Sequence, residues 1–193
     1  MIKNTIIAIC LSLFVFSKSF TQVYTKTEVK PIETISLEKS VTVLPIWFPA
    51  IAHEIRVKRL TSIYVSLKPF LTGQLMAKDG NVAIVAMPSV DLRHYYNLDK
   101  RAKENLNISR NSGNYLAMRV EYIFPRADVI GFSSDEKVST IIFGFVWGIQ
   151  RNYAKGFHLG LSIGPGMMFN SEKVRLINSG EFKIGIQLGS KKD

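Results

Sequence analysis

Apolar and polar residues alternate one by one through most of the chain from residue 61 onward. In the stretch 61–75, Ile63, Val65 and Leu67 hold alternate positions, and the positions between them are mostly polar. Successive side chains of a β-strand point to opposite faces, so this period of two predicts strands with one aliphatic and one polar face. Six segments follow the rule: 61–75, 82–97, 114–124, 139–153, 157–169 and 181–189.

The number of strands depends on how the segment 41–57 is divided. Turn sequences separate the six segments at 78–81, 111–113, 154–156 and 178–180. The segment 41–57 adds two strands, 41–48 and 51–57, if it is split at Pro49 and Ala50. If it is one long strand, an eighth strand lies within 22–40. We therefore predict an all-β fold, an antiparallel up-and-down transmembrane β-barrel of eight strands, over residues 41–189. A flexible lead-in at 22–40 precedes it and a short tail at 190–193 follows.

Strand length and aromatic placement favour lipid as the solvent of the aliphatic face. Several segments run well beyond the five or six residues usual in globular sheets, and a tilted strand needs about 9–11 residues to cross a bilayer. Aromatic residues lie towards strand ends, as in the girdles of membrane barrels. They are Trp47, Phe48, Tyr95, Tyr96, Tyr122, Phe124, Tyr153, Phe157 and Phe169.

The other face carries charged residues in the middle of strands. In a membrane barrel these side chains point into the lumen and pair there, because an unpaired buried charge is costly. The expected lumen charge network is Lys68, Asp91, Arg93, Arg119, Glu121 and Lys183. Glycines on the same face are typical of a narrow, strongly curved barrel. The alternative is a soluble secreted barrel of lipocalin type, with the aliphatic face turned inward and the charged face in water.

The N-terminal segment has the composition of a secretory signal peptide. A basic start containing Lys3 is followed by an apolar run to Phe16 and a more polar exit. We expect cleavage near Thr21, which leaves 1–21 as the signal peptide. The whole chain has 25 Lys and Arg against 15 Asp and Glu, a net charge of +10. Cleavage removes Lys3, Lys18 and the one cysteine, Cys10, which suits export to an oxidising compartment.

Three stretches resemble a family of small, mostly uncharacterised outer-membrane β-barrel proteins of Gram-negative bacteria. They are YYNLDKR at 95–101, SGNYL at 112–116 and GFVWGIQRNY at 144–153. The resemblance covers roughly 41–189 and carries no catalytic assignment. It implies location in the outer membrane and insertion by the outer-membrane assembly machinery. The chain departs from the common pattern of such barrels because it ends on LGSKKD instead of an aromatic residue.

The sequence offers little that points to catalysis. It has no phosphate-binding loop, no His-Glu-x-x-His and no Gly-x-Ser-x-Gly motif. His158 and Ser162 share a face, but strand residues four apart lie about 13 Å from each other, too far for a nucleophile and its base. His53 and His94 are equally isolated. We therefore expect no enzyme activity, no metal site and no cofactor.

Basic residues gather in the polar segment between two of the strands. Lys100, Arg101, Lys103 and Arg110 are candidates for contact with lipid headgroups or lipopolysaccharide phosphates. Nucleic-acid binding is not expected, because no basic stripe follows a regular element of this exported chain.

Three functions are compatible with these features. The first is a non-enzymatic outer-membrane barrel, in broad terms porin-like, with a structural, adhesive or small-solute role. Its partners would be outer-membrane lipid or lipopolysaccharide. The second is an outer-membrane lipid hydrolase that uses a histidine. The third is a soluble periplasmic or secreted ligand-binding barrel.

Overall fold

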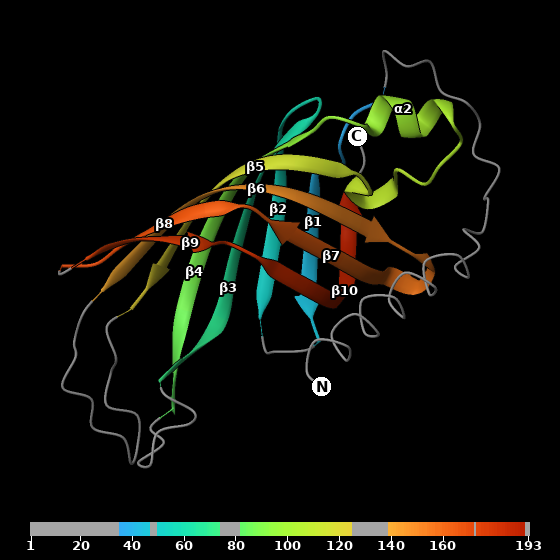
Figure 1. Ribbon diagram of the computed structural model, residues 1–193. Helices are drawn as coiled ribbons and strands as arrows, with labels where there is room; N and C mark the ends of the chain where they lie inside the picture. Colours follow the sequence, from blue (N-terminus) through green and yellow to red (C-terminus); the bar gives the residue numbers. More distant parts are fainter. Residues whose placement is uncertain (1–34, 47–49, 74–81, 125–138, 172, 192–193) are drawn as a thin grey trace, which may run out of the picture.

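The chain forms a closed antiparallel β-barrel of eight strands (Figure 1). The computed structural model describes residues 35–46, 50–73, 82–124, 139–171 and 173–191. The strand segments are β1 (Ser40–Pro45), β2 (Ile51–Lys58), β3 (Thr61–Gly73), β4 (Val82–Tyr95), β5 (Asn114–Ile123), β6 (Thr140–Asn152), β7 (Phe157–Ile163), β8 (Pro165–Phe169), β9 (Val174–Asn178) and β10 (Glu181–Lys191). The prediction of an all-β, eight-stranded antiparallel barrel is confirmed.

Sequential neighbours pair from β1 to β6, and β1 pairs with β10 to close the ring. On the remaining side, β7 and β8 are two parts of one strand of the barrel, because β6 pairs with β7 through 147–152 and with β8 through 141–144. β9 and β10 are likewise two parts of the next strand, because β9 pairs with β8 and β10 pairs with β7, so the ten segments make eight strands. The break between β7 and β8 falls at Gly164. A Cβ at this position would lie 1.9 Å from the carbonyl oxygen of Phe145, so only glycine permits this close approach of two backbones.

The first two strands are separate and short, which confirms the alternative in which the segment 41–57 forms two strands. β1 has 6 residues and β2 has 8, whereas β3 and β4 have 13 and 14. The pairing of β2 with β3 reaches only to Leu67, and the rest of β3 pairs with β4 alone. The barrel wall is therefore lowest at the β1–β2 hairpin.

The far part of the barrel contains a hairpin that the sequence pattern did not predict. β8 and β9 pair from Pro165 opposite Asn178 to Phe169 opposite Val174, and the backbone N–H of Lys173 donates to the side chain of Asn170 at the turn. The turn predicted at 178–180 instead joins β9 to β10. β10 also reaches Lys191, so Ser190 and Lys191 belong to a strand and not to the predicted tail.

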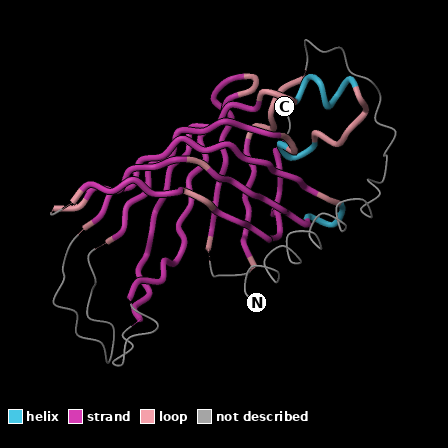
Figure 2. The backbone as a smooth tube through the Cα atoms, in the orientation of Figure 1, coloured by secondary structure: helices cyan, strands magenta, loops and turns pink. Residues whose placement is uncertain are grey.

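One end of the barrel is covered by a cap, which we define as residues 35–39 and 96–113. The cap contains α2 (Leu98–Lys103) and η3 (Ser109–Asn111), and η4 (Ala154–Gly156) forms a turn at the same end (Figure 2). Figure 1 shows α2 beyond this end, while the hairpins β3–β4 and β8–β9 extend towards the opposite end. The polar segment between β4 and β5 thus contains two short helices that the alternation did not predict.

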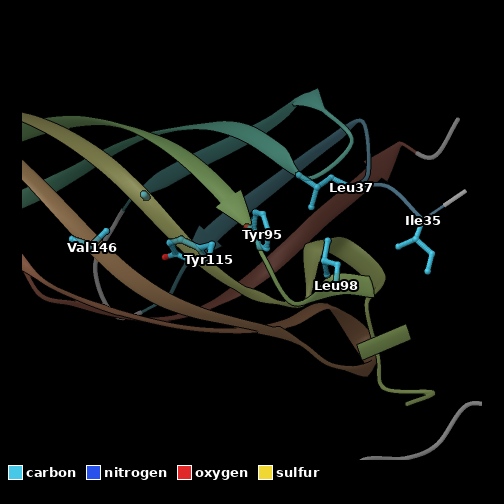
Figure 3. Packing of buried hydrophobic residues seen from close by; sticks show 7 residues of the cluster. Ile35, Leu37, Tyr95, Leu98, Tyr115 and Val146 are labelled. Atoms are coloured by element: carbon cyan, nitrogen blue, oxygen red, sulfur yellow. The ribbon is translucent and has the colours of Figure 1, made fainter. Parts of the chain in front are cut away.

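Apolar side chains attach the cap to the barrel. Ile35 and Leu37 from the chain before β1 and Leu98 from α2 pack against Tyr95 and Tyr115 (Figure 3). The backbone N–H of Leu37 donates to the carbonyl of Arg59 at 2.9 Å. The lead-in predicted at 22–40 is thus ordered and packed from residue 35, and its remainder, like the predicted signal peptide at 1–21, lies outside the described residues.

Candidate functional site

The polar faces of the strands point into the barrel and the aliphatic faces point out. Along β5, Tyr115, Ala117 and Arg119 are buried, whereas Leu116 and Met118 are 55% and 45% exposed. β1 is a partial exception, because Val41 and Val43 face inward and pack with Tyr64. Large exposed apolar side chains occur on every strand segment; they include Ile55, Val65, Leu67, Val90, Leu92, Val120, Ile141, Phe145, Leu161, Ile163, Met167, Phe182, Ile186 and Leu188. The apolar interior expected of a lipocalin-type barrel is therefore absent from the described part of this chain.

Asp91 is the centre of the buried charges. Its carboxylate accepts from Nε of Arg119 at 2.8 Å and from Nη2 of Arg93 at 2.9 Å. Asp91 and Arg119 lie directly opposite each other on β4 and β5, which places the two side chains on the same face at the same height. All three side chains are 1% exposed, so Asp91 is the closest carboxylate that neutralises both buried guanidinium groups.

A second group of charges lies above Asp91 towards the far end of the barrel. Lys68 contacts Glu121 at 2.7 Å and Glu181 at 3.1 Å. Glu181 also contacts Lys183 at 3.0 Å and Arg119 at 3.4 Å, which joins the two groups. The Lys68–Glu181 pair connects β3 with β10 across the interior, although β1 and β2 separate these strands in the sheet.

Arg93 lies between aromatic rings near the capped end. Its guanidinium carbon is 3.4 Å from the ring centre of Tyr64 and 4.5 Å from that of Tyr115, a cation–π arrangement. Arg93 also donates to Oε1 of Gln150 at 3.2 Å. The neighbouring carboxylate of Glu54 accepts from the hydroxyls of Ser62 and Tyr95 and from the amide of Gln150.

The structure brings all six residues of the expected charge network into one connected interior cluster. It adds two carboxylates that the sequence analysis did not assign, Glu54 and Glu181. The described strands then supply four cationic and four anionic side chains to the interior: Lys68, Arg93, Arg119 and Lys183 with Glu54, Asp91, Glu121 and Glu181. Their positions on the polar faces of strands 51–57 and 181–189 were the signal that could have identified the two carboxylates.

Side chains pack closely in the barrel interior around Arg93. A gap lined by Arg93, Tyr115, His158, Ser162 and Lys183 has no room for a water molecule. Tyr115 itself fits only because residue 148 is glycine, since a Cβ there would lie 2.2 Å from the ring carbon Cζ. Side chains therefore fill the lumen at the height of Arg93.

The three histidines occupy different environments. His158 is buried inside the barrel, where Nδ1 hydrogen-bonds to Oδ1 of Asn152 at 2.7 Å. Ser162 accepts from Nη2 of Arg119 at 3.2 Å, so its hydroxyl belongs to the charge cluster. His53 and His94 lie on other strands and hydrogen-bond to Thr42 and Thr61. Among the described residues, no three His, Cys, Asp or Glu side chains are grouped to hold a metal ion.

The basic residues expected to contact headgroups do not act alike. Lys100 and Lys103 on α2 are exposed. Arg101 is a correction: it is only 6% exposed, and its Nε and Nη2 donate to the carbonyl of Asn107 within the cap. Arg110 is partly buried, and its backbone N–H donates to the carboxylate of Glu38. In the same cap, hydrogen bonding to Arg59 lowers the pKa of the Asp99 carboxyl.

Most of the described aromatic residues predicted at strand ends are on the outside of the barrel, but Tyr95 is not. Its ring is fully buried, and its hydroxyl donates to Glu54 at 2.7 Å. Tyr96, the next residue, is 47% exposed, and its hydroxyl oxygen accepts from Nε1 of Trp147. Phe124 and Phe157 are also exposed. Trp47 and Phe48 lie outside the described residues.

Removal of the Tyr95 hydroxyl should measure how strongly the interior depends on hydrogen bonds to Glu54. Tyr95→Phe deletes one of the donors to a buried carboxylate, and we expect a loss of about 2 kcal/mol in the free energy of unfolding. Urea titration of the folded protein in detergent would measure it. Tyr122→Phe, on a ring that packs against Phe124, is the matched control and should change little. Equal effects of the two variants would contradict a special role for the Glu54 contact.

No family model, curated protein or solved structure matches this chain. No helix of the described residues is long and apolar enough to cross a membrane.

Proposed function

We propose that this chain is a non-enzymatic outer-membrane β-barrel protein with a closed lumen and a structural or adhesive role. The observation that carries the proposal is the orientation of the two faces, with aliphatic side chains outward and a charge-balanced polar cluster inward. The signal-peptide composition of 1–21 adds export to this picture. Insertion by the outer-membrane assembly machinery follows from the same proposal.

The outward face is difficult to reconcile with water as its solvent. Soluble monomers rarely expose continuous apolar patches larger than a few hundred Å². Here, outward residues such as Val65, Val90, Val120 and Phe143 lie side by side on β3 to β6, and the first three are each about half exposed. A closed barrel satisfies its backbone hydrogen bonds within the wall, which a bilayer requires.

Aromatic side chains border this apolar surface at both ends. Tyr96, Trp147 and Phe157 lie near the cap, while Phe124 and Phe169 lie at the ends of strands on the far side. Tyrosine and tryptophan prefer the boundary between hydrocarbon and water, and membrane barrels carry a girdle at each boundary. This placement supports a barrel that crosses the bilayer.

The filled interior supports a structural or adhesive role over solute passage. An eight-stranded barrel encloses room only for side chains or one small ligand, and the interior cluster already occupies it beside Arg93. The cap covers one mouth. A lipid hydrolase that uses His158 would need this histidine to be reachable, and it is 1% exposed inside the barrel.

Gel mobility of the membrane fraction tests the proposal. Cells expressing the full chain are fractionated, and the outer-membrane fraction is run in SDS with and without boiling. We expect a band whose mobility changes on boiling, because a closed barrel resists SDS until it is heated. Recovery of the protein in the aqueous fraction, without a heat-dependent shift, would contradict the proposal and favour a secreted soluble barrel.

A further inference from the structure

Arg151 is a cation on the outside of the barrel without a carboxylate partner among the described residues. It lies next to the last residue of β6, on the outward face that it shares with Trp147 and Ile149. Its Nη1 donates to the carbonyl of Gln150 at 2.8 Å and its Nη2 donates to Oδ1 of Asn114 at 2.7 Å. A guanidinium has five N–H donors, so three remain without an acceptor in the described structure.

The cap places a second guanidinium close to this one. The charge of Arg101, on α2, acts repulsively on Arg151. Arg101 uses Nε and one N–H of Nη2 for the carbonyl of Asn107, and Asn107 in turn donates to the backbone of Asn152 at 2.7 Å. Burial lowers the pKa of Arg101, which the Glu104 carboxylate partly offsets. An anion bound to Arg151 would offset this repulsion from Arg101.

Tyr96 and Trp147 frame the same position. The Tyr96 oxygen accepts from Nε1 of Trp147 at 2.7 Å and from Nδ2 of Asn114 at 3.4 Å. Its own hydroxyl hydrogen is left to donate outward, and the ring is half exposed. Asn114 links this pair to Arg151, so the hydroxyl and the guanidinium belong to one hydrogen-bonded unit. This unit lies where the apolar wall meets the cap.

We propose that Arg151, together with Tyr96, binds the phosphate group of a phospholipid headgroup at the capped end of the barrel. The buried charge of Arg101 adds positive potential beside it. A guanidinium binds phosphate through two parallel N–H donors, and Arg151 retains enough donors for this. The apolar wall beside Trp147 would hold the acyl chains. The assignment of the phosphate to a lipid rests on the proposed membrane function, whereas the anion site itself does not.

Trp147 provides a direct signal for binding. The chain has two tryptophans, so Trp47→Phe leaves Trp147 as the one indole. The folded protein in a neutral detergent is titrated with dihexanoyl phosphatidylglycerol while Trp147 fluorescence is recorded. We expect a saturable change with the phospholipid and a much weaker one with dihexanoylglycerol, which lacks the phosphate. An equal response to both lipids would overturn the proposal.

Two charge-neutralising variants separate a built site from general attraction. Arg151→Gln should weaken phosphatidylglycerol binding about tenfold, because it removes the charged donor of the site. Lys58→Gln removes the same charge from an exposed residue at the same end of the barrel and should leave the affinity within about twofold. Equal weakening by both variants, or none by Arg151→Gln, would overturn the proposal.

Inorganic phosphate distinguishes the source of the anion. If it produces the full response at the same concentration as the lipid, the site takes free phosphate and the headgroup assignment is overturned. Each variant is first checked for the heat-dependent gel shift, so loss of folding is seen separately. A barrel that fractionates with the outer membrane but shows no phosphate-dependent response removes this inference alone and leaves the proposed function standing.

Discussion

Asp91→Asn should destabilise the barrel by about 3–5 kcal/mol, because it removes the one carboxylate that contacts both Arg93 and Arg119. Asparagine keeps the shape of the side chain but not its charge. Both guanidinium groups are 1% exposed, so water cannot replace the lost partner without opening the barrel. Equilibrium unfolding in urea, followed by the loss of the heat-modifiable band, would measure the change.

Two further variants test whether the loss of stability comes from the unpaired arginines. Asp99→Asn removes an equal charge from a partly exposed pair with Arg59 and should have a small effect. The double variant Asp91→Asn with Arg119→Gln should recover part of the loss, because one of the stranded cations is gone. A loss after Asp91→Asn no larger than that of Asp99→Asn would show that the interior cations are neutralised in another way.

Alternation predicted most of the fold because a strand buries one of its two faces and exposes the other. Six strong segments and the split of 41–57 located the strands of the barrel within a few residues, except for β9 (Val174–Asn178), which no predicted segment contained. The break at Gly164 within the segment 157–169 was not predicted, because in the sequence Gly164 is one of several small residues in an alternating run. Its requirement comes from the carbonyl of Phe145, which belongs to another strand.

The interior charges were predictable as a set but not as pairs. Alternation assigns Asp91 and Arg119 to the inner face, but their contact depends on the register of β4 against β5. The contact of Lys68 with Glu181 depends on the diameter of the barrel, because β1 and β2 separate their strands in the sheet. The alternation within a single strand predicts neither the register nor the diameter of the barrel.

The cap was missed for a different reason. Ile35 and Leu37 stand in a polar segment, and Leu98 begins a helix of only six residues. Such short apolar elements are too short to show a periodicity in the sequence. Their side chains are buried only because the end of the barrel packs against them. The packing of the cap onto the barrel also buries Arg101. Its neighbours Lys100 and Lys103 remain exposed, although all three residues belong to one basic segment of the sequence.

Val90→Arg should distinguish lipid from water as the solvent of the outer face. Val90 is 46% exposed and lies between Val65 of β3 and Val120 of β5, in the middle of the apolar surface. An arginine on the lipid face near the centre of a bilayer costs about 2–4 kcal/mol in a membrane barrel. Folding equilibria measured in phospholipid vesicles should show this loss. On a soluble barrel, an exposed valine replaced by arginine changes stability by about 0.5 kcal/mol or less.

Val57→Arg is the matched control, because it makes the same substitution at a position that would lie at a different depth in the bilayer. Val57 is also an outward valine, 53% exposed, but it lies near the end of β2 beside the turn to β3. A charge at the interface reaches water and headgroups, so this variant should cost about 0–1 kcal/mol in the same vesicles. A small effect at both positions would mean that the aliphatic face is not in lipid. A large effect at Val90 alone would require a medium whose polarity changes along the barrel axis, as a bilayer's does.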